Sequence, residues 1–94
     1  MTEQGWARAL CDAITGTPRY RVGSFSLALA SAALLADGPN RRRLAQGFPG
    51  LVETLEAWEH IGYDYLSALA DGDDGAMESA YLEYQERNLA ESEV

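Results

Sequence analysis

The chain has no lysine, and all seven of its basic residues are arginine. This absence excludes catalysis through a lysine Schiff base and phosphate binding through the lysine of a phosphate-binding loop. An all-arginine basic set beside abundant alanine and glycine is typical of a GC-rich coding sequence. We therefore expect a protein of bacterial or phage origin, and an acidic high-salt proteome also fits this composition.

Cysteine and histidine are also scarce, with one of each among 94 residues. The single cysteine, Cys11, cannot form an intramolecular disulfide, so a cytoplasmic location is the default expectation. One cysteine and one histidine (His60) do not provide the ligands of a zinc site of the usual Cys/His type. We expect neither a metal nor a cofactor.

Long hydrophobic runs are missing too. The longest apolar stretch, residues 25–36, contains two serines and would rise only about 18 Å as a helix, against a bilayer core of about 30 Å. Residues 1–4 show no basic region followed by an apolar core, so we expect no signal peptide. The sequence predicts a soluble protein without membrane contacts.

The size and overall charge of the chain set further limits. Ninety-four residues, 47% of them hydrophobic, predict one globular domain that spans residues 1–94. The formal net charge of −8 argues against a protein that coats nucleic acid or an anionic membrane. We therefore expect no direct binding of nucleic acid.

Apolar residues at helical spacing predict a helix over residues 2–14. Thr2 is the predicted N-cap, and Gly16 marks the end of the helix. Residues 19–23 have no partner strand and are predicted to be a loop. Ser24 is predicted to cap a second helix that reaches Ala36 and is stopped by Gly38. Because this helix is small or apolar on all sides, we expect it to be the central helix of a bundle.

The rest of the chain predicts further helices. Asn40 is the expected cap of a short helix that ends before residue 47. A long helix is predicted over residues 51–69, with Gly62 inside it as a kink or a point of close packing. An Asp/Gly-rich turn at 71–75, whose aspartates can cap the next helix, precedes a last helix to Ala90, and we expect residues 91–94 to fray. The sequence thus predicts an all-α fold, a single irregular bundle of four to five helices that ends in an antiparallel helical hairpin.

Charge is segregated along the chain. Residues 1–50 hold six arginines and three acids, a net of +3, whereas residues 51–94 hold one arginine and twelve acids, a net of −11. Three interpretations remain open: the two halves neutralise each other within the domain, an acidic face stays exposed for a basic protein partner, or the acidity is an adaptation to salt. An exposed acidic face would steer a basic partner toward the protein.

Two groups of residues are candidate binding sites. Tyrosine is enriched in protein interfaces, so tyrosines beside acids on the last helices indicate a partner-binding surface. Arginines at the start of a short helix are unfavourable to its dipole unless an anion or an acidic side chain lies there. The predicted partner-binding residues are Glu53, Glu56, Glu59, Tyr63, Glu83 and Tyr84, and the predicted anion-binding residues are Arg41, Arg42 and Arg43.

Three more specific sites fail on their residues. The apolar spacing around Phe48 is close to that of a helix-turn-helix, but Pro49 stands where the turn glycine belongs, and the recognition helix would present glutamates to phosphates. The aspartates near residue 73 lack the later ligands of a calcium loop. Glu56 and His60 lie one turn apart, yet no nucleophile accompanies them. We expect no catalytic residues and no enzyme activity.

The sequence therefore predicts a small, acidic, non-enzymatic protein-interaction or regulatory protein. A protein partner is expected, and a basic one suits the acidic face; a homo-oligomer through the small-residue helix or the aromatic faces is a further option. The alternative is an acidic nucleic-acid mimic that occupies the nucleic-acid-binding groove of a larger protein. That alternative requires carboxylates spaced like phosphates along an exposed face.

Overall fold

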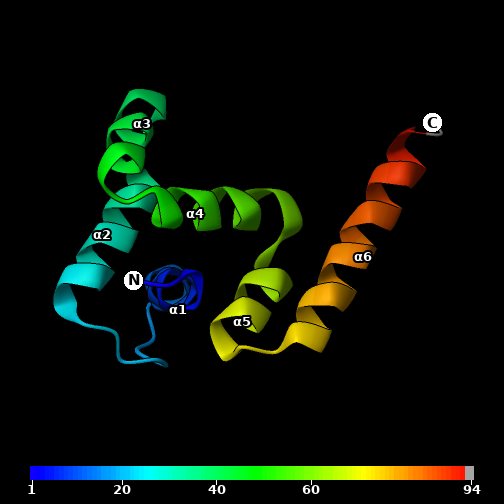
Figure 1. Ribbon diagram of the computed structural model, residues 1–94, viewed down its shortest axis with the longest axis horizontal. Helices are drawn as coiled ribbons and strands as arrows, with labels where there is room; N and C mark the ends of the chain where they lie inside the picture. The colour runs from blue at the N-terminus through cyan, green and yellow to red at the C-terminus, as the bar shows by residue number, and fades with distance from the viewer. Residues whose placement is uncertain (93–94) are drawn as a thin grey trace.

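A computed structural model describes residues 1–92, which form six α-helices and no strand within that range (Figure 1). The all-α prediction is therefore confirmed. The helices are α1 (Glu3–Thr15), α2 (Ser24–Leu35), α3 (Gly38–Gly47), α4 (Pro49–Ile61), α5 (Tyr63–Asp71) and α6 (Asp74–Ser92).

Helix α1 lies at the centre of the fold and packs against α2, α4 and α5 (Figure 1). Its ends are the predicted ones. The hydroxyl of Thr2 accepts a hydrogen bond from the backbone N–H of Gly5, and Gly16 adopts the left-handed conformation at φ 70°. Buried alanines, Ala7 and Ala9, let the neighbouring helices approach closely.

The core is a cluster of leucines from three helices, α1, α4 and α5. Leu10, Leu51, Leu55 and Leu66 are fully buried, and burial of each such side chain contributes about 1.5–3 kcal/mol. Trp6 covers one side of this cluster, where its ring meets Phe48 edge-on at 5.9 Å between centroids.

Helix α1 is also fastened to the end of α5 by two side chains. The Nε2 atom of Gln4 and the Nε atom of Arg8 both donate to the carbonyl oxygen of Ala70, at 3.3 and 2.9 Å. These bonds satisfy a carbonyl in the last turn of α5 that has no partner within its own helix.

The prediction that the second helix is central is wrong. Helix α2 lies at the edge of the fold (Figure 1), and only Ala30 and Ala33 are buried. Phe25 is 70% exposed and Leu35 is 87% exposed, because the side of α2 that packs on the core carries Ala30 and Ala33 flanked by Leu29 and Leu34 and leaves the other apolar residues outside. Its N-cap is Gly23 and its C-cap is Ala36, not the predicted Ser24 and Gly38.

The start of α3 also differs from the prediction. The helix begins at Gly38, and the carboxylate of Asp37, rather than Asn40, is the cap; it accepts from the backbone N–H of Asn40 at 3.1 Å. Both residue types are good caps, but Pro39 fits the first turn of a helix. The arginines therefore follow the first turn instead of opening the helix.

The predicted long helix is two helices. Gly62 separates α4 from α5 with φ 115° and ψ 177°, a conformation essentially restricted to glycine. Pro49 lies in the first turn of α4, so the break predicted between residues 46 and 51 is present but is limited to Phe48.

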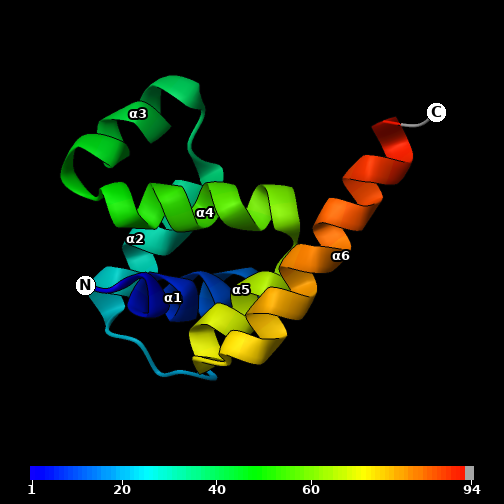
Figure 2. The ribbon, with the colours of Figure 1, turned by 45° about the vertical axis from the view of Figure 1, so that its right-hand side comes forward.

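Gly72 and Asp73 join α5 to α6. Gly72 is left-handed at φ 72°, and the carboxylate of Asp73 accepts from the backbone N–H of Ala76 at 3.1 Å, so the predicted turn and aspartate cap are confirmed. The first half of α6 packs on α5, where Ala80 is buried, and Arg87 bonds to α4; only the C-terminal end of the helix extends away from the other helices (Figure 2). Residues 91 and 92 belong to α6, and the rest of the tail expected to fray lies outside the described residues.

Every helix in the part of the chain that the structure describes is too short or too polar to cross a bilayer.

Candidate protein-binding surface

Exposed carboxylates cover the outer sides of α4, α5 and α6, and we call them the acidic surface. On α4, the residues between Glu53 and Glu56, Thr54 and Leu55, are buried, so the amphipathic pattern of the helix turns its acids to solvent. The acidic surface consists of Glu53, Glu56, Glu59, Asp64, Glu78, Glu83, Glu86 and Glu91, all of them exposed.

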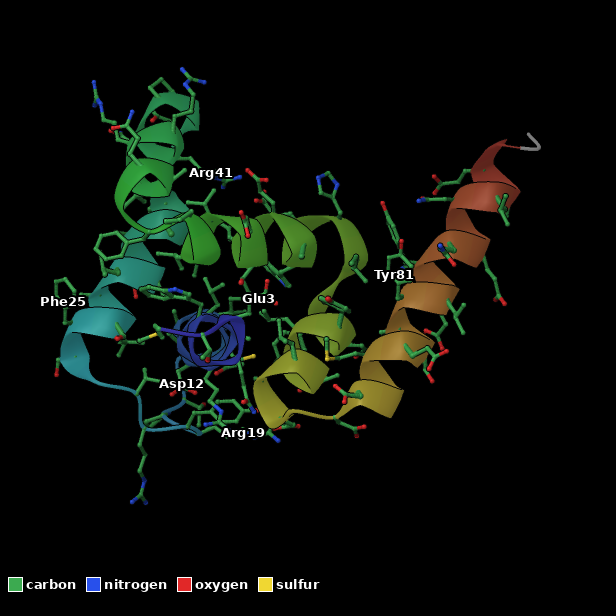
Figure 3. All side chains as sticks on the ribbon, viewed as in Figure 1. Glu3, Asp12, Arg19, Phe25, Arg41 and Tyr81 are labelled. Carbon is green, nitrogen blue, oxygen red and sulfur yellow. The ribbon has the colours of Figure 1, made fainter. Side chains whose placement is uncertain are left out.

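Arg41 reaches from α3 to the acidic surface. Its Nη1 atom donates to Oε1 of Glu59 at 2.5 Å (Figure 3). The Nε atom of the same guanidinium is buried and has no hydrogen-bond partner within residues 1–92. Arg41 therefore offsets the charge of a predicted partner-binding glutamate, and one of the three predicted anion-binding arginines is already paired with an acid.

The other two arginines of α3 are exposed. Arg42 borders a hollow of about 230 Å³ that it shares with Glu56. The Nη1 atom of Arg43 donates to Oδ1 of Asn40 at 3.0 Å, and Arg43 borders the groove between α2 and α3. Arg41 and Arg42 therefore border one hollow, which also holds Glu56, and Arg43 borders a different one.

Tyr63 and Glu83 lie together in a hollow of about 250 Å³ between α5 and α6, beside Arg87. Tyr63 is 38% exposed, and its hydroxyl interacts with the thiol of Cys11. Partial burial, followed by the neighbouring thiol, raises the pKa of Tyr63. One side of this tyrosine is therefore part of the surface, and its hydroxyl is held by the core.

Tyr84 and Glu59 lie together in a second hollow, of about 300 Å³, between the end of α4 and α6. The ring of Tyr84 is 6.2 Å from that of Tyr81, which Figure 3 labels on α6. Arg87 borders this hollow as well, and its Nη2 atom donates to the carbonyl oxygen of Ile61 at 3.1 Å. The two hollows are thus neighbours on either side of a side chain that ties α6 to α4.

The predicted partner-binding residues therefore form two parts. Glu59, Tyr63, Glu83 and Tyr84 surround Arg87. Glu53 and Glu56 continue along α4 toward α3, with Glu53 about 9 Å from Glu59 along the helix axis.

Sequence reasoning missed a polar cluster on another side of α1. Asp12 is only 4% exposed, and both of its carboxylate oxygens accept from the backbone N–H of Tyr20 at 3.2 Å. The hydroxyl of Tyr20 donates to Asp71 at 2.5 Å, and Arg19 lies 3.3 Å from the same carboxylate (Figure 3). No helical spacing signals these contacts, because the loop after α1 brings Tyr20 back to Asp12, and Asp71 is 51 residues beyond Tyr20 in the chain.

The environment of Tyr20 strongly favours its neutral form. Burial disfavours the phenolate, and the hydrogen bond and negative charge of Asp71 act in the same direction, so the pKa of Tyr20 rises to about 12. Its ring also lies under two guanidinium groups, those of Arg19 at 5.0 Å and Arg8 at 5.7 Å. All of these groups hold the loop after α1 against α5, which is a structural role.

The described residues provide no evident metal site. No group of three or more His, Cys, Asp or Glu side chains within residues 1–92 is arranged to hold an ion. The thiol of Cys11 is buried, and burial raises its pKa.

No family model, curated protein or solved structure matches this chain. The arguments about function therefore rest on the surface itself.

Proposed function

We propose that this protein is a small, acidic, non-enzymatic interaction or regulatory protein that binds a basic protein partner through the acidic surface. The observation that carries the proposal is the pairing of a tyrosine with a carboxylate in two neighbouring hollows, Tyr63 with Glu83 and Tyr84 with Glu59. We take α5 and α6 as the predicted antiparallel hairpin that presents these residues, and the cytoplasm as the compartment.

The chemistry of the hollows suits arginine or lysine side chains. A guanidinium that enters beside Tyr84 gains a cation–π contact with the ring and a charge-assisted hydrogen bond to Glu91 or to Oε2 of Glu59, since Arg41 occupies Oε1. Arg87 is already bonded to the backbone of Ile61, so it can hold the walls of the hollows in place while a partner binds. The unpaired acids around them raise the rate at which a basic partner arrives.

A defined probe tests this proposal. We expect a fluorescent arginine-rich peptide to bind the protein at low salt and to dissociate as the salt concentration rises. Glu83→Gln should weaken binding roughly tenfold, as loss of one partner of a charge-assisted contact does. Glu3→Gln is the matched control, since it removes the same charge from an exposed residue outside the acidic surface. Equal weakening by both variants would mean non-specific attraction by net charge and would contradict the proposal.

The alternative function, nucleic-acid mimicry, depends on the glutamate row of α4. Glu53 and Glu56 are exposed and unpaired by any ion pair in the described residues, but Glu59 is bonded to Arg41. A row with one neutralised member is a poorer imitation of a phosphate backbone, which favours the first proposal. Reversal of Glu53 and Glu56 to arginine separates the two, because mimicry requires that this change abolish binding while the hollows around Arg87 remain intact.

A further inference from the structure

We infer that the outer face of α6 of one copy docks into the apolar groove between α2 and α3 of a second copy, so that the chain associates with itself. The groove and the outer face of α6 are both distinct from the hollows around Arg87, so the inference goes beyond the proposed function.

The receiving surface is an apolar groove of about 570 Å³ between α2 and α3, lined by Leu35, Leu44 and Phe48 together with Ala32 and Ala36. Leu35 is 87% exposed.

Phe25 extends this apolar surface along α2. It is 70% exposed and points away from the fold, with its ring 6.4 Å from that of Phe48 (Figure 3). Contiguous exposed apolar residues of this kind mark interaction sites in soluble proteins.

The rim of the groove is basic. Helix α2 carries no charged residue, and α3 carries three arginines and no acid. Arg43 borders the groove itself, beside Asn40. The one acid nearby in the chain, Asp37, is engaged as the cap of α3. A partner for this groove should therefore present apolar side chains flanked by carboxylates.

The outer face of α6 has this composition. Leu82 and Leu89 are exposed, and because they lie seven residues apart they share one face of the helix, about 10 Å apart along its axis. Glu78 and Glu86 are exposed. Each lies four residues from Leu82, which turns it by only about 40° around the helix axis from that leucine.

The other face of α6 is already in use. Ala80 is buried against the fold, and Arg87 is bonded to Ile61. The leucine stripe therefore faces away from the packed side of the helix and has no apolar cover within the described chain.

The groove and the leucine stripe of one copy cannot meet. Helices α2 and α3 lie at one end of a molecule that is 43 Å long, and α6 lies at the other end (Figures 1 and 2). Contact between them is therefore intermolecular. Because donor and receptor are different surfaces, two copies that exchange α6 reciprocally form the smallest closed assembly, and open association forms larger ones.

Charge reversal tests this inference. In the docked arrangement Glu86 of one copy pairs with Arg43 of the next. We expect light scattering coupled to size exclusion to detect a concentration-dependent oligomer of the wild type. Glu86→Arg and Arg43→Glu should each weaken association roughly tenfold or more, because each places like charges together. An equimolar mixture of the two variants should associate again, since every contact between unlike copies then joins opposite charges.

Matched controls and a stability measurement keep the test decisive. Glu91→Arg is the control for Glu86→Arg, since it makes the same charge change on the opposite face of α6. Arg21→Glu, in the loop before α2, is the control for Arg43→Glu. Both control variants should associate like the wild type. All four positions are exposed, and thermal unfolding should be nearly unchanged. A wild type that is monomeric at every concentration, or a mixture that fails to associate, overturns the inference. Binding of the arginine-rich peptide by such a monomer would leave the proposed function standing.

Discussion

The hydroxyl of Tyr20 donates a hydrogen bond to Oδ1 of Asp71 at 2.5 Å and thereby joins the loop after α1 to the end of α5. The same residue donates its backbone N–H to the buried carboxylate of Asp12. Tyr20 thus donates hydrogen bonds to carboxylates of two helices, Asp12 of α1 and Asp71 of α5.

Alkaline pH should destabilise the protein through Tyr20. Its pKa rises from the usual 10 to about 12 in the folded state, so the folded state retains a proton that the unfolded state loses. The stabilising contribution is complete below pH 10 and is lost as the pH rises through 12. Urea unfolding over that range should give a free energy of unfolding that falls with pH. Tyr20→Phe should reduce the slope, and an unchanged slope in this variant would assign the effect to other groups.

Removal of the Asp12 carboxylate should destabilise the fold at neutral pH. Asp12→Ala leaves the backbone N–H of Tyr20 without its acceptor in a part-buried position, at a cost of about 1–3 kcal/mol. Asp12→Asn keeps one acceptor oxygen and should cost less. Glu53→Ala, at an exposed residue, should change the free energy of unfolding by less than about 0.5 kcal/mol. Equal effects of Asp12→Ala and Glu53→Ala would contradict this role.

The break between α4 and α5 should depend on Gly62. Its φ of 115° disfavours any side chain, so Gly62→Ala should cost about 1–3 kcal/mol. Gly47→Ala is the matched control, because a methyl group there also meets open space but φ is not positive. That variant should be neutral or stabilising by up to about 1 kcal/mol. Chemical unfolding of both proteins compares them directly.

Cys11 should resist thiol reagents in the folded protein. The side chain is 2% exposed, and burial raises its pKa, so little reactive thiolate is present. We expect labelling by a thiol-reactive chromophore to be slow in buffer and fast in denaturant at the same pH. Labelling at equal rates in both would show that the region around α1 opens readily.

The sequence predicts a helix end correctly where a single residue decides the local backbone geometry. Thr2 and Gly16 bound α1, and Asp73 caps α6, because a cap needs only its own few neighbours. Asp37 and Asn40 show the limit of this reasoning. Both residues are suitable caps and they lie only three residues apart. The sequence predicts Asn40 as the cap, but the helix begins after Asp37.

Signals that depend on tertiary packing were missed. Helix α2 has small or apolar residues on all sides, and this pattern alone does not tell which side packs on α1. The side with Ala30 and Ala33 does, whereas Ala28 and Ala32 are exposed. Gly62 is compatible with a helix interior, so the break at this residue is visible only in the folded backbone. The contact of Arg41 with Glu59 was anticipated only as one alternative, that the arginines pair with the protein's own acids.

The bonds from Gln4 and Arg8 to Ala70 connect residues 66 and 62 positions apart, and they bear on how the chain reaches its fold during synthesis. A ribosome releases α1 long before α5, so the side of α1 that α5 covers stays exposed until most of the chain has emerged. The chain loses the entropy of closing this long loop before α5 packs over Leu10 and Trp6. Folding should therefore be slow for an all-helical protein of this size. During that interval the nascent α1 is the segment that a chaperone would bind.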